Sequence, residues 1–435
     1  MKYSATTPGS RKKMLDVLGL TSVEELLASI PESDRSQVDL DIEGPVAEAD
    51  LRLRLEAMKG RRPRAAFLGA GLYPHYVPAT VDSVAARSEW VTSYTPYQPE
   101  LAQGTLTMYY EFQTYFARLT GQECANSGMY DGSTALAEAV LMAHRIRPKA
   151  KPVVYVSRGV HPQYREVLRT YARFANLEII EMAWDRVTGR TRIEASAEDL
   201  AAAVAVVFQS PNYFGMLDDL NDLAEGAFRI AVCTEALSLA LLPPPRADIT
   251  VGEAQSFGIP MQLGGPTAGF FATKNKWIRK MPGRLVGRTV DATGAEAFCI
   301  TLATREQFIR REKATSNICT ASGLMCLRAA IYMSLLGGRG LTDLARKNAA
   351  TARFFVKGLA DIGIAPAFEG PWFNECVLDL RQHPLLWDRL IEKDIVLGLP
   401  LEDHSPELAG HILFCATEMH ASQAEELLQE IKSHV

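Results

Sequence analysis

Short apolar runs that alternate with helical patterns between residues 130 and 275 constrain the fold more than any other feature of the sequence. The runs lie at 153–156, 177–180, 204–208, 229–232 and 248–251. They are rich in Val and Ile, and helical patterns lie at 133–147 and 160–175. Short apolar runs separated by helices are typical of parallel strands covered on both faces. The sequence therefore predicts an α/β fold with a large, mainly parallel sheet.

The segments before and after this region have different patterns. The first 60 residues carry Leu and acidic residues at helical spacing, and Ser22 with Glu25 matches a helix capping box. Beyond residue 310, helical patterns lie at 322–336 and 341–360, and strand patterns lie at 376–379 and 412–415. We therefore predict an N-terminal helical arm (1–60), a large α/β domain (61–310) and a small C-terminal α+β domain (311–435).

Charge and apolar content exclude several classes of protein. The 46 Lys and Arg residues against 51 Asp and Glu residues leave no basic surplus for binding a nucleic-acid backbone. The apolar runs are too short to cross a membrane, and the first residues lack the apolar core of a signal peptide. The seven cysteines include no CxxC pair, so no metal site is predicted. We expect a soluble, cytoplasmic protein whose partners are small molecules or proteins, not nucleic acid or a membrane.

A loop rich in proline and aromatic residues precedes the sheet region. It reads Trp90-Val91-Thr92-Ser93-Tyr94-Thr95-Pro96-Tyr97-Gln98-Pro99-Glu100, with Gln103-Gly104 close behind. Because proline restricts the backbone, such a loop presents polar groups with little ordering cost on binding. The same residues also suit a loop that only braces itself against the sheet, and the sequence leaves both interpretations open.

A second motif, Tyr130-Asp131-Gly132-Ser133-Thr134, stands directly before a helical pattern. Backbone N–H groups and hydroxyls at a helix N-terminus can hold a phosphate group. An ordinary helix cap uses the same residues. Gly132, Ser133 and Thr134 are therefore either a remnant phosphate loop or a cap.

These motifs, together with Phe67-Leu68-Gly69-Ala70-Gly71, resemble the P-protein family of the glycine cleavage system, and within it subunit 1 of the two-subunit type. The resemblance covers essentially the whole chain. It implies the fold of the fold-type I pyridoxal-phosphate-dependent transferases. It also implies that the loop with Tyr94, Thr95, Pro96, Tyr97, Gln98 and Glu100 lies at the mouth of an active site at a subunit interface.

The lysine that forms the Schiff base in the catalytic chains of this family is missing. No lysine occurs from Pro152 to Thr273. The catalytic chains carry His-Lys-Thr-Phe where this chain has Ala254-Gln255-Ser256-Phe257, so Gln255 stands at the lysine position. A carboxamide cannot form an imine. Cys233 stands where the resemblance expects the aspartate that pairs with the pyridinium nitrogen.

Other residues near these positions have less specific interpretations. His161 matches the residue that stacks on the cofactor ring, but without the lysine and the aspartate it is interpreted as a structural or cap residue. Lys274, Lys276 and Lys280 follow a glycine-rich loop and are interpreted as a solvated edge.

The resemblance therefore implies a chain that binds no pyridoxal phosphate and has no catalytic residue when alone. Subunit 2 of the implied heterotetramer would carry the cofactor, and the complex would decarboxylate glycine and pass the aminomethyl group to the lipoyl group of H-protein. Two alternatives stay open. One is a self-sufficient fold-type I aminotransferase or lyase that uses Lys274, and the other is a purely structural partner of subunit 2.

Overall fold

The computed structural model describes residues 6–35, 42–60, 62–91, 95–218, 226–318 and 322–435. The chain divides into two compact units, Met1–Arg61 and Arg62–Val435. The boundary predicted near residue 310, between a large and a small domain, stays a prediction.

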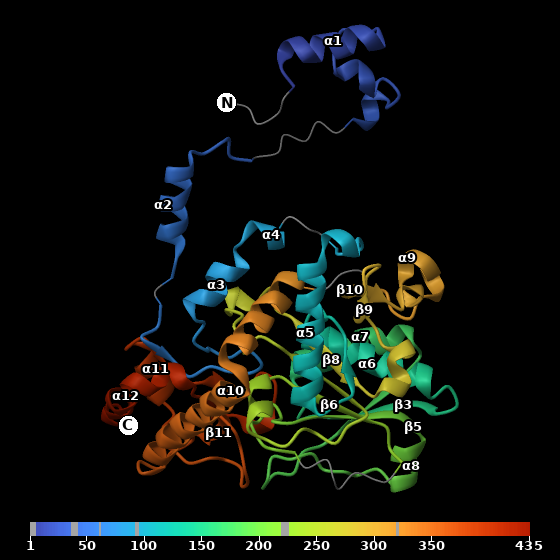
Figure 1. Ribbon diagram of the computed structural model, residues 1–435. Coiled ribbons are helices and arrows are strands. Elements are labelled where there is room, and N and C mark those ends of the chain that lie inside the picture. The colour runs from blue at the N-terminus through green and yellow to red at the C-terminus, as the bar shows by residue number, and fades with distance from the viewer. Residues whose placement is uncertain (1–5, 36–41, 61, 92–94, 219–225, 319–321) are drawn as a thin grey trace. The chain divides into compact units, whose positions relative to one another are not determined.

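The first unit consists of short helical elements. Helix α1 (Pro8–Leu18) is followed by 3-10 turns at Glu24–Leu27 and Glu32–Asp34 and by helix α2 (Glu48–Met58) (Figure 1). The Glu25 N–H donates to Ser22 Oγ at 3.3 Å, but the Glu25 carboxylate accepts the Thr21 N–H at 3.2 Å. The predicted capping box is therefore only half formed, and Val23 is the N-cap of the 3-10 turn that follows. None of these elements contains a buried residue. Among its described residues, the apolar side chains of this unit therefore form no core of their own.

The second unit is built around a seven-stranded sheet with the strand order β2-β8-β7-β6-β5-β3-β4. The strands are β2 (Cys124–Ala125), β3 (Lys151–Ser157), β4 (Glu178–Met182), β5 (Ala203–Gln209), β6 (Arg229–Cys233), β7 (Ile249–Glu253) and β8 (Gly269–Thr273). Strands β3 to β7 run parallel, whereas β8 runs antiparallel to both β7 and β2. This arrangement confirms the predicted mainly parallel sheet.

Successive side chains of each strand point to opposite faces of the sheet, so its apolar runs place apolar side chains on both faces. Helices cover both faces. On one face, Ile230 and Val232 pack with helices α6 (Gly132–Ile146) and α7 (Pro162–Phe174). On the other face, Cys233 packs with helices α5 (Gln103–Thr120) and α10 (Gly323–Ala360), which lie side by side in Figure 1. Helix α8 (Ala197–Ala202) adds Leu200 to a smaller cluster around Ala231.

Helix α10 joins two helical segments that the sequence predicts separately. Gly337, with φ 61° and ψ 177°, interrupts the helical backbone between them. Although α10 has 38 residues, no helix in the described ranges is apolar enough over a sufficient length to cross a membrane.

The second unit also contains a smaller sheet, in its C-terminal part (residues 322–435), and several short elements. Its sheet has the order β11-β14-β13, and β1 pairs with β12. These strands are β1 (Ala65–Ala66), β11 (Glu375–Asp379), β12 (Ile395–Val396), β13 (Leu399–Pro400) and β14 (His411–Cys415). Strands β9 (Leu285–Val290) and β10 (Glu296–Thr301) form an antiparallel hairpin. The remaining helices are α3 (Ala79–Ala85), α4 (Ser88–Val91), α9 (Gln307–Arg310), α11 (Leu386–Ile391) and α12 (Ala424–Ser433).

The Phe67 ring packs the start of the second unit against its C-terminal part. Its ring stacks on Phe414 at 4.9 Å and on His420 at 4.6 Å, and it meets Phe355 of α10 edge-on at 4.9 Å. These contacts fix the point from which the following segment, residues 69–76, runs toward the end of the large sheet.

Gly252 in β7 is packed too closely to accept a side chain. A Cβ atom there would overlap the carbonyl oxygen of Cys233 and lie 2.7 Å from the Phe270 ring. We expect Gly252→Ala to lower the free energy of unfolding, measured by urea denaturation, by about 1–3 kcal/mol. Gly338→Ala is the matched control, because a Cβ atom at that helical position meets nothing within 4 Å. Equal destabilisation by both changes would contradict this account.

Candidate functional site

Gln255, at the predicted lysine position, lies just beyond β7 and is 2% exposed. Its Oε1 accepts a hydrogen bond from the Tyr73 N–H at 2.8 Å. Its Nε2 donates to the carbonyl oxygens of Tyr73 at 3.0 Å and Ile259 at 2.9 Å. A lysine ammonium has donors but no acceptor, so it could not receive the Tyr73 N–H. The Gln255 carboxamide therefore connects the backbone at Tyr73 with the backbone at Ile259.

Cys233 ends β6 with its side chain completely buried. Burial raises the pKa of the thiol to about 12, and its Sγ donates to the Glu235 carbonyl oxygen at 3.3 Å. The group is therefore neutral near pH 7. It supplies no negative charge at the position where the resemblance expects an aspartate.

The N-terminus of α6 is bonded to side chains of the chain itself. Asp131 accepts the Thr134 N–H at 2.7 Å and the Ser133 hydroxyl at 2.6 Å, and the Thr134 hydroxyl accepts the Asp131 N–H at 3.3 Å. This is the reciprocal geometry of a capping box. The hydroxyls of the Gly132-Ser133-Thr134 motif are thus engaged in a helix cap.

The Glu253 side chain accepts a hydrogen bond from another backbone N–H group at the N-terminus of α6. Its carboxyl group accepts the Gly132 N–H at 3.1 Å, the Ala254 N–H at 3.1 Å and the Ala268 N–H at 3.2 Å. The Thr267 hydroxyl donates to it at 3.2 Å. Burial raises the pKa of Glu253 to about 8. The Glu253 carboxyl group therefore occupies the acceptor position in a cluster of backbone N–H groups, and such clusters hold phosphate in other proteins.

His161 caps the N-terminus of α7 and contacts the segment that Gln255 holds. Its Nδ1 accepts the Gln163 N–H at 3.2 Å, which leaves Nε2 to donate to the Ala70 carbonyl oxygen at 2.8 Å. Burial lowers the pKa of His161 to about 4, so the ring is neutral at pH 7.

Glu375, at the start of β11, binds the same segment and is not predicted from the sequence. It accepts the Ala70 N–H at 2.6 Å and the Tyr73 hydroxyl at 3.1 Å, and burial raises its pKa to about 8. The only sequence signal is an acidic residue directly before an apolar strand pattern, which is common in surface strands as well.

A buried ion triad is the second feature that the sequence does not reveal. His75 lies between Glu235, at 3.1 Å from Nε2, and Glu418, at 3.0 Å from Nδ1. Burial alone lowers the pKa of His75, but the two carboxylates outweigh it and raise the pKa to about 10. Burial likewise opposes ionisation of Glu418, but His75 lowers its pKa to about 2. The triad ties residues 69–76 to the sheet and to the C-terminal part.

The proline-rich loop lies against a different part of the structure. Tyr94 is outside the described residues. The Tyr97 hydroxyl accepts a hydrogen bond from Arg284 at 3.1 Å, and the Tyr97 ring meets Phe308 edge-on at 5.5 Å. Pro96 is buried, Thr95 is partly buried, and Gln98 and Glu100 are exposed. Within the described residues, the loop shares no hydrogen bond with Gln255 or Cys233.

Lys274 lies at the opposite ends of the strands from Gln255. Its Nζ pairs at 2.7 Å with Asp248, the residue before β7, whereas Gln255 follows the other end of that strand. In the parts of the chain that the structure describes, no three His, Cys, Asp or Glu side chains are grouped to hold a metal ion.

Comparison with known proteins agrees with the sequence motifs. The family model described as "Glycine cleavage system P-protein" matches residues 1–431. The chain belongs to the P-protein family. The resemblance predicted from the motifs is confirmed.

Two relatives within this family illustrate the similarity. A protein of Solibacter usitatus named probable glycine dehydrogenase (decarboxylating) subunit 1 is 45% identical over 432 residues, which cover 96% of this chain and 94% of the relative. A protein of Thermotoga maritima with the same name is 43% identical over 439 residues, which cover 99% of each.

Solved structures agree with this assignment. A crystal structure of glycine decarboxylase (P-protein) of the glycine cleavage system, in inhibitor-bound form, matches all of both chains with a TM-score of 0.90 and 39% identity. Glutamate decarboxylase of Lactobacillus brevis matches with a TM-score of 0.65 and 12% identity, over 93% of this chain and 96% of that one. At that identity the match shows the fold alone, and the predicted fold-type I architecture is confirmed.

The raised pKa of Glu375 links stability to pH. Because its pKa rises from an ordinary 4.5 to about 8 on folding, its contribution is complete below pH 4.5 and is lost as the pH rises through 8. We expect the wild type to lose stability from pH 5 to pH 8 and Glu375→Gln to lose less. The difference should approach, at most, about 1.4 kcal/mol per pH unit.

Urea unfolding at several pH values in this range measures the effect. Glu402→Gln is the control, because it removes an exposed carboxylate near the same sheet. If Glu375→Gln and the wild type have parallel stability profiles, Glu375 is not protonated in the folded protein.

Proposed function

We propose that this chain is subunit 1 of the glycine dehydrogenase (decarboxylating) of the glycine cleavage system, and that it acts in the cytoplasm in a heterotetramer with subunit 2. Subunit 2 carries pyridoxal phosphate, and the complex decarboxylates glycine and transfers the aminomethyl group to the lipoyl group of H-protein. The observation that carries the proposal is Gln255, whose carboxamide is fully engaged with backbone where a catalytic chain needs a lysine.

The residues of this chain do not fit pyridoxal phosphate. Gln255 offers no amine for an imine. The neutral Cys233 thiol cannot balance a pyridinium charge as a carboxylate does. Glu253 already accepts the Gly132 N–H at the end of α6, so a cofactor phosphate would have to displace a carboxyl group. No step of the reaction is therefore assigned to a cofactor held by this chain.

Exposed apolar side chains support the proposal that this chain binds a partner subunit. In the first unit, Val17 is 87% exposed and Leu53 is 71% exposed, and its helices contain no buried residue. Around the proline-rich loop, Tyr97, Leu101 and Phe308 are at least half exposed. Large apolar side chains gathered on a surface mark interaction sites. Both regions are therefore assigned to contacts with subunit 2.

The proline-rich loop is the part assigned to the shared active site. Tyr94, Thr95, Pro96, Tyr97, Gln98 and Glu100 border the cofactor pocket of subunit 2 in this proposal. Arg284 and Phe308 hold Tyr97 in place, and buried Pro96 fixes the backbone before it. A small substrate such as glycine offers few contacts, so its positioning depends on rigid groups that close the pocket.

The position of Lys274 argues against the self-sufficient enzyme. Its amine is paired with Asp248 at the amino end of β7, away from the strand ends that carry Gln255 and Cys233. The purely structural partner is the remaining alternative, and the loop substitutions below distinguish it from a contribution to the active site.

We expect Gln255→Lys to give no glycine decarboxylation by this chain alone. The new amine would lose the acceptor for the Tyr73 N–H, and Cys233 and Glu253 would still oppose cofactor binding. A barrier higher by only about 4 kcal/mol slows a reaction roughly a thousandfold. Glycine-dependent release of CO2 from the purified variant measures this.

Borohydride reduction of the wild-type chain with pyridoxal phosphate is the companion experiment. Peptide mapping should find no specifically modified lysine, and a pyridoxyl-lysine within residues 230–290 would overturn the proposal.

We expect Tyr97→Phe to lower the turnover of the assembled complex by roughly tenfold, the size of one hydrogen bond to a charged or reacting group. Exchange of labelled bicarbonate into glycine measures turnover, and gel filtration measures assembly. Tyr115→Phe is the control, since it removes a hydroxyl that bonds to Ser334 on helix α10 and lies outside the loop. Unchanged exchange in intact Tyr97→Phe and Glu100→Gln complexes would favour the purely structural partner.

A further inference from the structure

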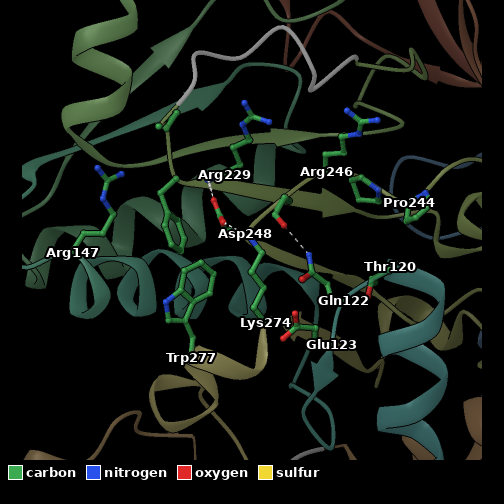
Figure 2. Close-up of a pocket in the computed structure, with 16 residues that line it drawn as sticks. Thr120, Gln122, Glu123, Arg147, Arg229, Pro244, Arg246, Asp248, Lys274 and Trp277 are labelled. Carbon is green, nitrogen blue, oxygen red and sulfur yellow. Dashed lines mark hydrogen bonds and ion pairs between the residues drawn. The ribbon is translucent and has the colours of Figure 1, made fainter.

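A pocket of about 750 Å³ lies at the amino-terminal ends of the parallel strands (Figure 2). Arg229 begins β6 and Asp248 precedes β7, whereas Cys233 and Glu253 end these strands. The pocket is therefore separated from the Gln255 region by the length of the sheet. Its volume is typical of a site for a small organic molecule.

The wall of the pocket carries an excess of positive charge. Four cationic side chains, Arg147, Arg229, Arg246 and Lys274, face two carboxylates, Glu123 and Asp248. Both carboxylates are bonded within the wall: Glu123 accepts the Asn275 N–H at 2.7 Å, and Asp248 accepts the Arg229 N–H at 3.0 Å and pairs with Lys274. Within the described residues, neither carboxylate forms an ion pair with Arg147 or Arg246.

Figure 2 shows how these charges are arranged. The side chains of Arg229 and Arg246 extend on one side of Asp248, and Lys274 approaches Asp248 from the other side. The cations thus come from several elements, and all of them line the same pocket.

Arg147, just after α6, has an incompletely bonded guanidinium group. Its Nη2 donates to the Ala201 carbonyl oxygen, but its Nη1 is buried and has no hydrogen-bond partner in the described structure. A buried donor without an acceptor is destabilising. An oxyanion in the pocket would supply the missing acceptor, and guanidinium groups match the geometry of phosphate oxygens.

Apolar side chains form the rest of the wall. Phe228 packs against Trp277 with 5.1 Å between ring centroids, and Pro244 and Pro245 line the same cavity. Lys274 and Lys276 lie over the Trp277 ring at 5.3 and 4.4 Å. A bare inorganic anion would use the cations and leave this apolar surface without a contact.

We propose that this pocket binds a small organic phosphate of nucleotide size. Its phosphate groups contact Arg147, Arg246 and Lys274, and its organic part lies along Phe228 and the two prolines. The site is independent of the function proposed above, because it lies at the other ends of the strands.

Calorimetric titration of the purified full-length chain tests this site, with ATP and inorganic tripolyphosphate as the probes. We expect saturable binding of ATP that weakens at high salt. Arg147→Gln and Arg246→Gln should each weaken ATP binding by about tenfold or more. Arg186→Gln, which removes an exposed arginine outside the pocket, should leave ATP binding unchanged.

Thermal melting of each variant checks its fold. Arg246 is exposed, so Arg246→Gln should fold and can test the site even if Arg147→Gln does not fold. ATP should bind more tightly than tripolyphosphate, because only ATP reaches the apolar wall. Absence of saturable ATP binding, or an equal loss in Arg186→Gln, would overturn the site. Equal affinity for the two probes would overturn the assignment of an organic phosphate.

Discussion

The hydrogen bonds between the Gln255 carboxamide and the backbone of Tyr73 are the interaction on which the rest of the candidate site depends. They fix residues 69–76 at the end of the large sheet. From there Ala70 reaches Glu375 and His161, and His75 reaches the two carboxylates of its triad. A side chain that can both donate and accept is required at this position, and Gln255 meets that requirement where a lysine would not.

The buried ionisable groups around this segment serve structure in two different ways. Glu253 and Glu375 are held toward the neutral form by burial, and each receives hydrogen bonds from nearby backbone. His75 and Glu418 stay charged because each is bonded to the other. Catalytic groups in a pocket keep bonding capacity for a substrate, whereas these groups use theirs within the chain. This is why the proposed function places chemistry in the partner subunit and assigns to this chain the surfaces that meet it.

The sequence predicted those elements whose burial leaves a local pattern. Strands β5 to β7 are visible because buried parallel strands are nearly continuous apolar runs, and the partly buried strands β3 and β4 still carry short apolar runs. Strand β8 is missed, because Gly269-Phe270-Phe271-Ala272-Thr273 follows a glycine-rich loop and lacks Val and Ile. The β9–β10 hairpin is missed because polar and charged residues interrupt its strands, and the two patterns on either side of Gly337 do not reveal that they form one helix.

The sequence by itself determined that the predicted Schiff-base position, Gln255, offers no amine, because imine formation depends on the covalent structure of the side chain and on no distant contact. It also determined the family, through motifs that are read along the chain. Only the tertiary structure decided that Glu253 accepts the N–H of Gly132, 121 residues away, and that His75 lies between Glu235 and Glu418. Such contacts join segments far apart in the sequence, so they exist only once the strands and the C-terminal part pack together. The electrostatics of the buried groups follows from that packing, because burial and neighbouring charge, not residue type, set their pKa values.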